Sequence, residues 1–192
     1  MGLVRPQAGD PRIVFPGEWG KGMAERDFYY PGNRKETHYL WWWTKGDPVL
    51  VFGVTKDREV VVVRQFRAGA NNFMLEIPGG IPKKGEDPRR AGEREFLEET
   101  GYKPREITNL HCTSYIDAPS LNVKCVFLLG TDCEKVGEPE LDENEKGTIE
   151  TVLVPIEKWY EKIWAGEIKD NKAIACSLLV LPHIISGELK FK

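Results

Sequence analysis

Three glutamates near the middle of the chain, Glu95, Glu98 and Glu99, have the residue type and the spacing of a cation-binding site. Residues three or four apart on an α-helix differ in direction by only about 40° to 60°, so all three side chains leave one face of a helix. Like charges at this spacing destabilise a helix, and a bound cation removes that repulsion. Carboxylate oxygens are hard ligands that suit Mg²⁺ or Mn²⁺. A solvated acidic face is the alternative interpretation.

The residues that flank these glutamates predict the helix that must carry them. Asp87 can cap a helix that begins at Pro88, and Gly101 stands just past its expected end. On the side opposite the glutamates, Phe96 can face a core and Gly92 permits close approach of another element. The pattern therefore predicts a helix with one acidic face and one buried face.

The rest of the chain predicts a mixture of strands and helices. Strands rich in β-branched and aromatic residues are expected at residues 37–44, 49–54, 59–66, 73–77, 107–116, 123–130 and 148–154. The second and third of these form a hairpin in this interpretation, and Val60–Val63 indicate burial on both faces. Helices are expected at 156–164, from its amphipathic spacing, and at 171–185, kinked or ended near Pro182. The fold class is therefore α/β or α+β, with residues 1–36 as the least regular part.

The composition limits the class of protein and its partners. The chain has 192 residues, of which 41% are hydrophobic and 30% charged, and its net charge is −3. This balance is typical of a globular domain and argues against nucleic acid held by bulk positive charge. No apolar run approaches the roughly 20 residues of a membrane span, and the N-terminus shows no secretory signal. Four scattered cysteines without a CxxC pair are typical of reduced thiols, so we expect a cytoplasmic protein without nucleic-acid or membrane partners.

The segment Gly80–Tyr102 resembles the signature of the Nudix hydrolases, G-x5-E-x7-R-E-U-x-E-E-x-G-U, in which U is apolar or aromatic. The matching positions are Gly80, Glu86, Arg94, Glu95, Phe96, Glu98, Glu99, Gly101 and Tyr102. From average composition, a chance match at all seven fixed positions in any register of this chain has a probability of about 10⁻⁶. Coincidence therefore does not explain the resemblance.

This resemblance implies a mixed β-sheet sandwiched between helices, in an enzyme that hydrolyses a nucleoside diphosphate linked to another group. The metal ligands that it implies are Glu95, Glu98, Glu99 and the carbonyl of Gly79. Arg94 would orient the carboxylates through salt bridges, and Glu86 would support the preceding loop. The implied cofactor is Mg²⁺ or Mn²⁺, which polarises a phosphoryl oxygen and can lower the pKa of bound water. Glu98 and Arg94 are therefore also candidates for catalytic roles.

Two segments before the signature resemble the branch of ADP-ribose pyrophosphatases and nucleotide-sugar hydrolases, Arg64–Arg67 (RQFR) and Met74–Gly80 (MLEIPGG). By this resemblance Arg67 would be a fork-shaped donor to the diphosphate, a task for which guanidinium is better suited than ammonium. Arg64 is a second candidate, and surface charge at a strand end is the alternative for both arginines. Glu76 is a candidate ligand of the metal or of the terminal ribose, or a residue that caps a strand.

Two segments after the signature also resemble that branch. Residues 115–120 occupy the place of its proline loop, but Ser120 replaces the usual Gly and a usual Glu is missing, which leaves other sugar nucleotides as candidate substrates. Residues 141–145 (LDENE) resemble a mobile catalytic loop in which a glutamate takes a proton from the attacking water. Glu143 holds that place, with Glu145 and Glu140 as alternatives. A disordered acidic surface turn is the other interpretation.

Aromatic residues are frequent before residue 45. In the resembling branch, an N-terminal segment packs across a two-fold dimer and supplies residues that stack on the substrate base. We therefore expect a homodimer, with residues 1–44 as an aromatic-rich segment for dimerisation and base contact and residues 45–192 as the Nudix domain. Tyr30 and Trp43 are candidates for stacking, which contributes about 1–3 kcal/mol per base. Packing in a core or an interface is the alternative.

The predicted function is metal-dependent hydrolysis of the diphosphate bond of a nucleoside diphosphate sugar, a small-molecule substrate. ADP-ribose, split into AMP and ribose 5-phosphate, is the first candidate, and GDP-mannose or another sugar nucleotide is the second. Further alternatives are a nucleotide or RNA-cap pyrophosphatase and, from a different class, a non-catalytic domain that senses a nucleotide. The intact signature disfavours the sensor, and the acidic net charge disfavours work on RNA caps.

Overall fold

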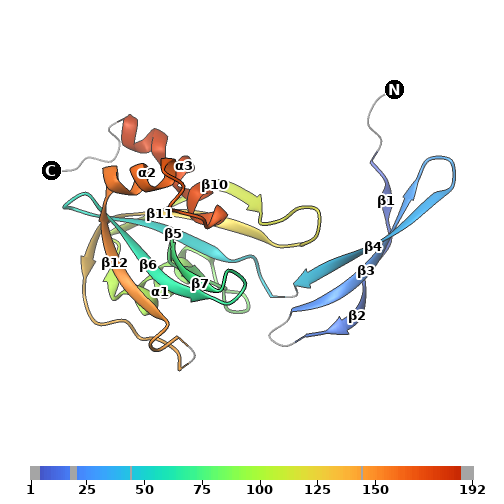
Figure 1. The fold of residues 1–192 in the computed structure, drawn as a ribbon, viewed down its shortest axis with the longest axis horizontal. Helices are drawn as coiled ribbons and strands as arrows, with labels where there is room; N and C mark the ends of the chain where they lie inside the picture. Colours follow the sequence, from blue (N-terminus) through green and yellow to red (C-terminus); the bar gives the residue numbers. More distant parts are fainter. Residues whose placement is uncertain (1–4, 18–20, 44, 144, 187–192) are drawn as a thin grey trace. The chain divides into compact units, whose positions relative to one another are not determined.

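The computed structural model describes residues 5–17, 21–43, 45–143 and 145–186. The chain divides into two units, which are described separately (Figure 1). The N-terminal unit combines Met1–Gly46 with Tyr115–Lys124, and the larger unit combines Asp47–Ser114 with Cys125–Lys192. Among the described residues, none of the helices has the length and the apolar character that crossing a membrane requires.

A mixed β-sheet forms the framework of the larger unit. Its main strands are β5 (Val49–Thr55), β6 (Glu59–Arg67), β10 (Glu106–Tyr115), β11 (Lys124–Lys135) and β12 (Ile149–Pro155). They lie in the order β10-β11-β5-β6-β12, with β5 parallel to β11 and β6 antiparallel to both β5 and β12. The short strands β7 (Asn72–Glu76), β8 (Gly79–Gly80) and β9 (Tyr102–Lys103) pair with β6, β5 and β11. The predicted β5–β6 hairpin is therefore confirmed.

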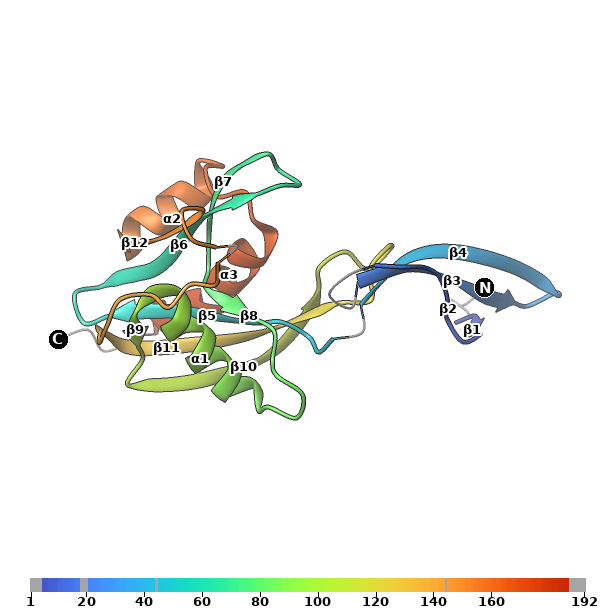
Figure 2. The same cartoon turned by 90° about the horizontal axis from the view of Figure 1, so that it is seen from below.

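Helices cover the sheet on both faces, with α1 (Pro88–Thr100) on one side of β5 and α3 (Asn171–Ile185) on the other (Figure 2). Helix α2 (Ile156–Trp164) follows β12 and contacts β12 and β6. Because both faces are covered, Val60–Val63 of β6 are at most 1% exposed, as their sequence predicts. This arrangement confirms the predicted fold class.

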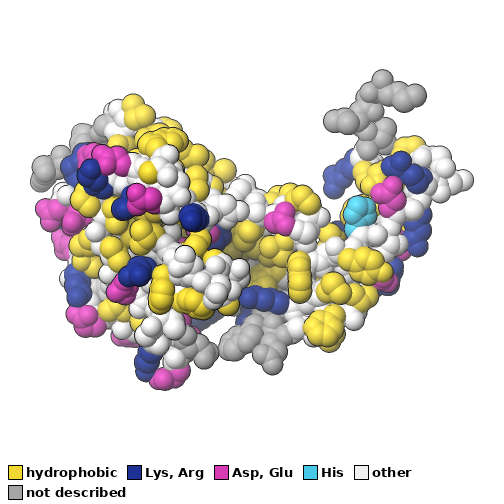
Figure 3. Space-filling view, viewed as in Figure 1, with side chains coloured by type: hydrophobic (Ala, Val, Ile, Leu, Met, Phe, Trp, Pro, Cys, Tyr) yellow, Lys and Arg dark blue, Asp and Glu magenta, His cyan; other side chains and the backbone are white. Residues whose placement is uncertain are grey.

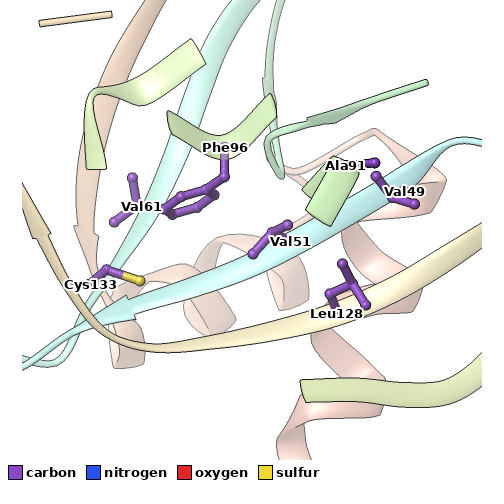
Figure 4. Packing of buried hydrophobic residues seen from close by; sticks show 7 residues of the cluster. All are labelled: Val49, Val51, Val61, Ala91, Phe96, Leu128 and Cys133. Carbon is purple, nitrogen blue, oxygen red and sulfur yellow. The ribbon is translucent and has the colours of Figure 1, made fainter. Parts of the chain in front are cut away.

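Helix α1 begins and ends where its sequence predicts. The Asp87 carboxylate accepts a 2.9 Å hydrogen bond from the backbone N–H of Arg89, and Gly101 ends the helix with a left-handed φ of 72°. Phe96 packs fully buried among valines of β5 and β6 (Figure 4). A Cβ added to Gly92 would lie 2.4 Å from the Leu128 side chain, so only glycine lets this helix approach β11 so closely.

Helices α2 and α3 pack against each other through buried polar contacts. The indole N–H of Trp159 donates a 2.8 Å hydrogen bond to the Ser177 hydroxyl. Helix α3 does not end at Pro182 but continues to Ile185. Only one further turn follows this proline, and the helix tolerates the single backbone hydrogen bond that proline removes. The four cysteines are free thiols, and three of them, Cys125, Cys133 and Cys176, are buried.

The N-terminal unit is a small antiparallel sheet, more regular than the sequence indicates for residues 1–36. Its strands are β1 (Gln7–Ala8), β2 (Arg12–Pro16), β3 (Lys21–Tyr30) and β4 (Arg34–Trp43), and β3 pairs with all three others. Charged side chains stabilise it from inside, because the buried Asp27 carboxylate binds Arg12, Lys35 and Thr37. Strand β3, at the centre of this sheet, therefore lacks the continuous hydrophobic run that reveals strands in the larger unit.

Residues 115–124 belong to the N-terminal unit through hydrogen bonds to β4. The backbone N–H of Trp41 donates to the carbonyl of Ser120 at 2.8 Å, and the backbone N–H of Trp43 donates to the Asn122 side chain at 2.7 Å. Large hydrophobic side chains of this unit are exposed to solvent, among them Ile13, Val14, Phe15, Tyr39 and Trp41. Figure 3 shows hydrophobic side chains gathered on the surface of this unit.

Candidate active site

Helix α1 carries Glu95, Glu98 and Glu99, whose spacing of three and four residues brings their side chains out on neighbouring positions of the helix surface. We call these three residues the acidic stripe. Phe96 and Gly92 lie three and seven positions before Glu99, so the packed face adjoins Glu99 and is not opposite to it, contrary to the expectation. These two residues fix the helix in the core, and it cannot rotate about its axis without breaking that packing. The backbone therefore holds the three carboxylates in one region of the larger unit.

Arg94 connects the acidic stripe to the loop before the helix. Its Nη1 donates to Glu95 at 2.7 Å and to Glu98 at 3.0 Å, while its Nε and Nη2 donate to Glu86 at 3.0 and 2.8 Å. The guanidinium of Arg94, together with the backbone N–H of Lys83, lowers the pKa of Glu86 to about 2. One arginine thus binds and orients three glutamates, and its single positive charge offsets only part of their combined negative charge.

Glu99 carries the strongest electrostatic perturbation of the stripe. Burial raises the pKa of its carboxyl to about 8, and the negative charges of Glu145 and Glu95 act in the same direction. A 2.9 Å hydrogen bond from the backbone N–H of Gly79 opposes that shift. Burial also raises the pKa of Glu95, although Arg94 opposes the rise. A cation beside these carboxylates would favour their ionised forms.

The donor atoms of the stripe fit a hard divalent cation. Carboxylate oxygens supply the ligands that Mg²⁺ and Mn²⁺ prefer, and the backbone of Gly79–Gly80 lies beside them. A Cβ added to Gly80 would lie 2.3 Å from the carboxyl carbon of Glu95, so glycine keeps this space open. Within the described ranges, no three acidic, cysteine or histidine side chains already converge on one point. Because Arg94 holds Glu95 and Glu98, these side chains must turn before they ligate one ion with Glu99.

Arg67 and Glu76 meet across the β6–β7 hairpin. The Nε and Nη2 atoms of Arg67 each donate a 2.6 Å hydrogen bond to one oxygen of the Glu76 carboxylate. The positive charge of Arg67 also acts on Glu99, which places this pair near the acidic stripe. Sequence reasoning named both residues but missed their pairing, since it depends on the register that the turn between β6 and β7 sets.

Arg64 lies apart from Arg67 although the two share strand β6. Positions three apart on a strand face opposite sides of a sheet. The Arg64 guanidinium donates to the exposed Glu150 carboxylate at 3.0 Å and lies over the Phe73 ring, 5.1 Å from its centre. The structure therefore does not bring Arg64 to the pair that Arg67 forms with Glu76.

The loop after β11 places its glutamates differently from one another. The side chain of Glu143 is 86% exposed and pairs with Lys146. Glu145 accepts a 3.1 Å hydrogen bond from the backbone N–H of Asp142, and its charge raises the pKa of Glu95 and Glu99. The backbone N–H of Glu140 donates to the Glu98 carbonyl at 2.7 Å, which ties the start of the loop to α1. Of the three candidate bases, Glu145 thus acts electrostatically on the stripe.

Tyr30 and Trp43 belong to the N-terminal unit. The Arg34 guanidinium lies 4.3 Å from the centre of the Tyr30 ring. The Trp43 indole N–H donates to the carbonyl of Gly46 at 2.9 Å, and Lys21 lies over its ring. Stacking of either residue on a substrate base stays a prediction.

Comparison with known proteins agrees with this geometry. The family model of the NUDIX domain matches residues 44–174. An ADP-ribose pyrophosphatase from Bacillus subtilis (strain 168) is 28% identical over 141 residues, which are 73% of this chain and 75% of that protein. A GDP-mannose pyrophosphatase from Salmonella typhimurium is 26% identical over 137 residues, covering 67% of this chain and 69% of the other.

A solved structure named an ADP compounds hydrolase is similar in fold, with a TM-score of 0.81 and 16% identity, and covers 98% of each chain. The family model spans more than half of the chain, and its signature residues form the acidic stripe, Arg94 and Glu86. The chain therefore belongs to the NUDIX domain family and is one of its pyrophosphohydrolases.

Proposed function

We propose that this enzyme hydrolyses the diphosphate bond of a nucleoside diphosphate sugar with Mg²⁺ or Mn²⁺, and that ADP-ribose is its substrate, giving AMP and ribose 5-phosphate. The observation that carries the proposal is the acidic stripe, in which burial holds the pKa of Glu99 at about 8 until a cation offsets the cost of ionisation. The name of the 28% identical relative supports ADP-ribose as the first substrate to test.

In this proposal, Glu95, Glu98, Glu99 and the Gly79 carbonyl hold the divalent ion. When bound, the ion polarises a phosphoryl oxygen and screens the repulsion between substrate and carboxylates. Arg94 holds Glu95 and Glu98 beside the site through ionic contacts until these side chains turn toward the ion. Arg67 donates hydrogen bonds to the diphosphate, for which its planar guanidinium is suited.

A glutamate of the loop after β11 takes the proton from the attacking water in this proposal. The sequence resemblance assigns this role to Glu143, and the electrostatic influence of Glu145 on the stripe supports Glu145 as the alternative. The variants Glu143→Gln and Glu145→Gln separate the two assignments. Loss of the general base lowers kcat by about 10²- to 10⁴-fold, and the other variant keeps kcat within a few-fold.

A substrate panel tests the proposed activity. Purified protein is assayed with ADP-ribose, GDP-mannose, UDP-glucose, NADH and diadenosine polyphosphates, each with Mg²⁺ and with Mn²⁺. The highest kcat/KM on ADP-ribose, with AMP and ribose 5-phosphate as products and no turnover in EDTA, supports the proposal. A preference for GDP-mannose favours the second candidate, which the name of another relative supports. Nucleotide binding without hydrolysis would identify a sensor and refute the enzyme proposal.

We also propose that two copies of the chain associate through the N-terminal unit. The exposed Ile13, Val14 and Phe15 of β2 and the exposed Trp41 of β4 support this, since monomeric proteins rarely expose such contiguous apolar surface. Light scattering measured behind a sizing column gives the mass directly, and a monomer at micromolar concentration would refute the dimer.

A further inference from the structure

Glu76 is among the most deeply buried carboxylates of the larger unit. Its side chain is 3% exposed, while the side chain of its partner Arg67 is 47% exposed. Both oxygens of Glu76 accept a 2.6 Å hydrogen bond from the same guanidinium. Parallel bonds of this kind fix the plane and the rotation of a guanidinium as well as its position.

The pairing leaves a defined part of Arg67 available. A guanidinium has five N–H groups, and the Glu76 carboxylate uses one on Nε and one on Nη2. The other N–H groups make no hydrogen bond to the described part of the chain, and 47% of the side chain is exposed to solvent. The positive charge of Arg67 acts to lower the pKa of Glu99 in the acidic stripe, and the negative charge of Asp170 acts to raise the pKa of Arg67. An anion bound beside the stripe would therefore meet the free edge of this guanidinium.

From this geometry we infer that Glu76 is a positioning residue, which holds the Arg67 fork toward the substrate diphosphate and binds neither metal nor ribose itself. The inference rests on the proposed function and assigns Glu76 a role within the same site. A metal ion or a ribose hydroxyl could reach Glu76 only by displacing Arg67 from both carboxylate oxygens. Because the Glu76 side chain is only 3% exposed, its carboxylate has little surface at which a partner other than Arg67 could bind.

The two strands explain why this position suits a carboxylate. In the antiparallel β6–β7 hairpin, Glu76 lies opposite Val63 and Arg67 lies opposite Asn72. Residues 63, 65 and 67 share a face of β6, so Glu76 reaches along that face to Arg67. A buried ion pair adds little net stability compared with apolar residues of similar volume. Orientation of a charged donor is therefore the property that this pair supplies.

The test compares Glu76→Gln with the matched control Glu157→Gln. Glutamine keeps the size of the side chain but loses the charge and one acceptor, so Arg67 is no longer held at two points. We expect kcat/KM for ADP-ribose to fall about 100-fold, the usual consequence of a misplaced substrate-positioning group. In the control, Glu157 loses an exposed contact with Arg58 at 2.6 Å, and kcat/KM stays within two-fold of the original protein.

A double variant separates positioning from a direct role. Once Arg67→Ala has removed the fork, adding Glu76→Gln lowers kcat/KM no further, because Glu76 acts only through Arg67. A further loss of ten-fold or more in the double variant would overturn the inference. Arg67→Lys, which keeps the charge but not the two-point contact, should resemble Glu76→Gln. It also keeps the test decisive if Glu76→Gln fails to fold.

A metal titration supplies a readout that does not depend on turnover. Binding of Mn²⁺ alone, followed by electron paramagnetic resonance, should have the same Kd in Glu76→Gln as in the original protein. A ten-fold weaker Kd would make Glu76 a metal ligand and refute the positioning role. If the original protein hydrolyses no sugar nucleotide, both the proposed function and this inference are refuted. If it does and Glu76→Gln is equally active, only the inference fails.

Discussion

The backbone N–H of Gly79 donates a 2.9 Å hydrogen bond to the Glu99 carboxylate, which joins strand β8 to the last turn of helix α1. These residues are far apart in the chain, and the contact ties a buried acid to a rigid peptide group. An N–H bond of this kind stabilises the ionised carboxylate, yet burial still dominates and raises the pKa of Glu99 to about 8. Glu99 is therefore the residue at which charge, the proposed metal binding and folding are most closely linked.

Replacing Glu99 by Gln should abolish turnover with little loss of fold. The amide has the shape of the protonated acid, which the buried site already favours, but it cannot supply a charged ligand to a divalent ion. We expect kcat to fall by about 10³-fold or more, which is the size of the loss when a group that stabilises charge in the transition state is removed. Steady-state kinetics and a thermal melt of the same preparation measure both effects. Activity retained in folded Glu99→Gln protein would refute the proposed metal role.

The pH dependence of stability should carry the signature of Glu99 when metal is removed. Its pKa is raised from 4.5 to about 8 in the folded state, so between these values the folded state binds more protons than the unfolded state. Stability therefore falls as pH rises through this window, by on the order of 5 kcal/mol, and levels off above pH 8. Urea unfolding in EDTA at several pH values measures the slope. The slope should be absent in Glu99→Gln protein, and Mg²⁺ or Mn²⁺ should reduce it in the original.

Replacing Arg94 by Ala should destabilise the fold by about 2 kcal/mol, because its loss leaves Glu86, Glu95 and Glu98 without their shared cation. The low pKa of Glu86 adds a pH signature. Its stabilising effect is present above about pH 4.5 and is lost as pH falls toward 2. Acid unfolding of the Arg94→Ala protein should lack this component. The exposed Arg105 is the control, since its Asp132 contact is 3.9 Å long and its removal should change stability by less than about 0.5 kcal/mol.

Replacing Gly80 by Ala should damage function more than stability. The new Cβ would lie 2.3 Å from the Glu95 carboxyl group, which is the flexible end of a side chain and can move away. The carboxylate would then leave its position in the acidic stripe, so we expect Mn²⁺ to bind at least about ten-fold more weakly. Gly137→Ala is a matched control, because no atom lies within 4 Å of the Cβ that it would add. Equal Mn²⁺ affinity in the two variants would contradict the expectation.

Local sequence signals predict most of the larger unit. Asp87 and Gly101 mark the two ends of α1 because capping is decided by neighbouring residues. The consecutive valines of β6 also predict their environment locally, because an unbroken hydrophobic run is typical of a strand that is buried on both faces. The spacing of Glu95, Glu98 and Glu99 likewise fixes their shared face without knowledge of any distant contact.

Features that depend on pairing between distant residues were not predictable. The N-terminal sheet contains a buried Asp27 carboxylate with three partners, and a pattern of hydrophobic residues does not predict such a polar contact. The contact of Arg67 with Glu76 requires the register of a hairpin. Helix α3, by contrast, spans Asn171–Ile185 as the sequence predicts, and it passes Pro182 because a proline near a helix end removes only one backbone hydrogen bond.

The N-terminal sheet is assembled from two separate stretches of chain, since residues 115–124 are bonded to Trp41 and Trp43 of β4. Deleting the N-terminal residues of the chain therefore removes only part of this unit, because residues 115–124 remain. An enzyme expressed from residue 47 onward would retain the segment between β10 and β11 while losing strand β4, to which that segment is bonded. A graft of this sheet onto another scaffold must likewise carry both pieces, so the smallest exchangeable part of this enzyme is discontinuous in its gene.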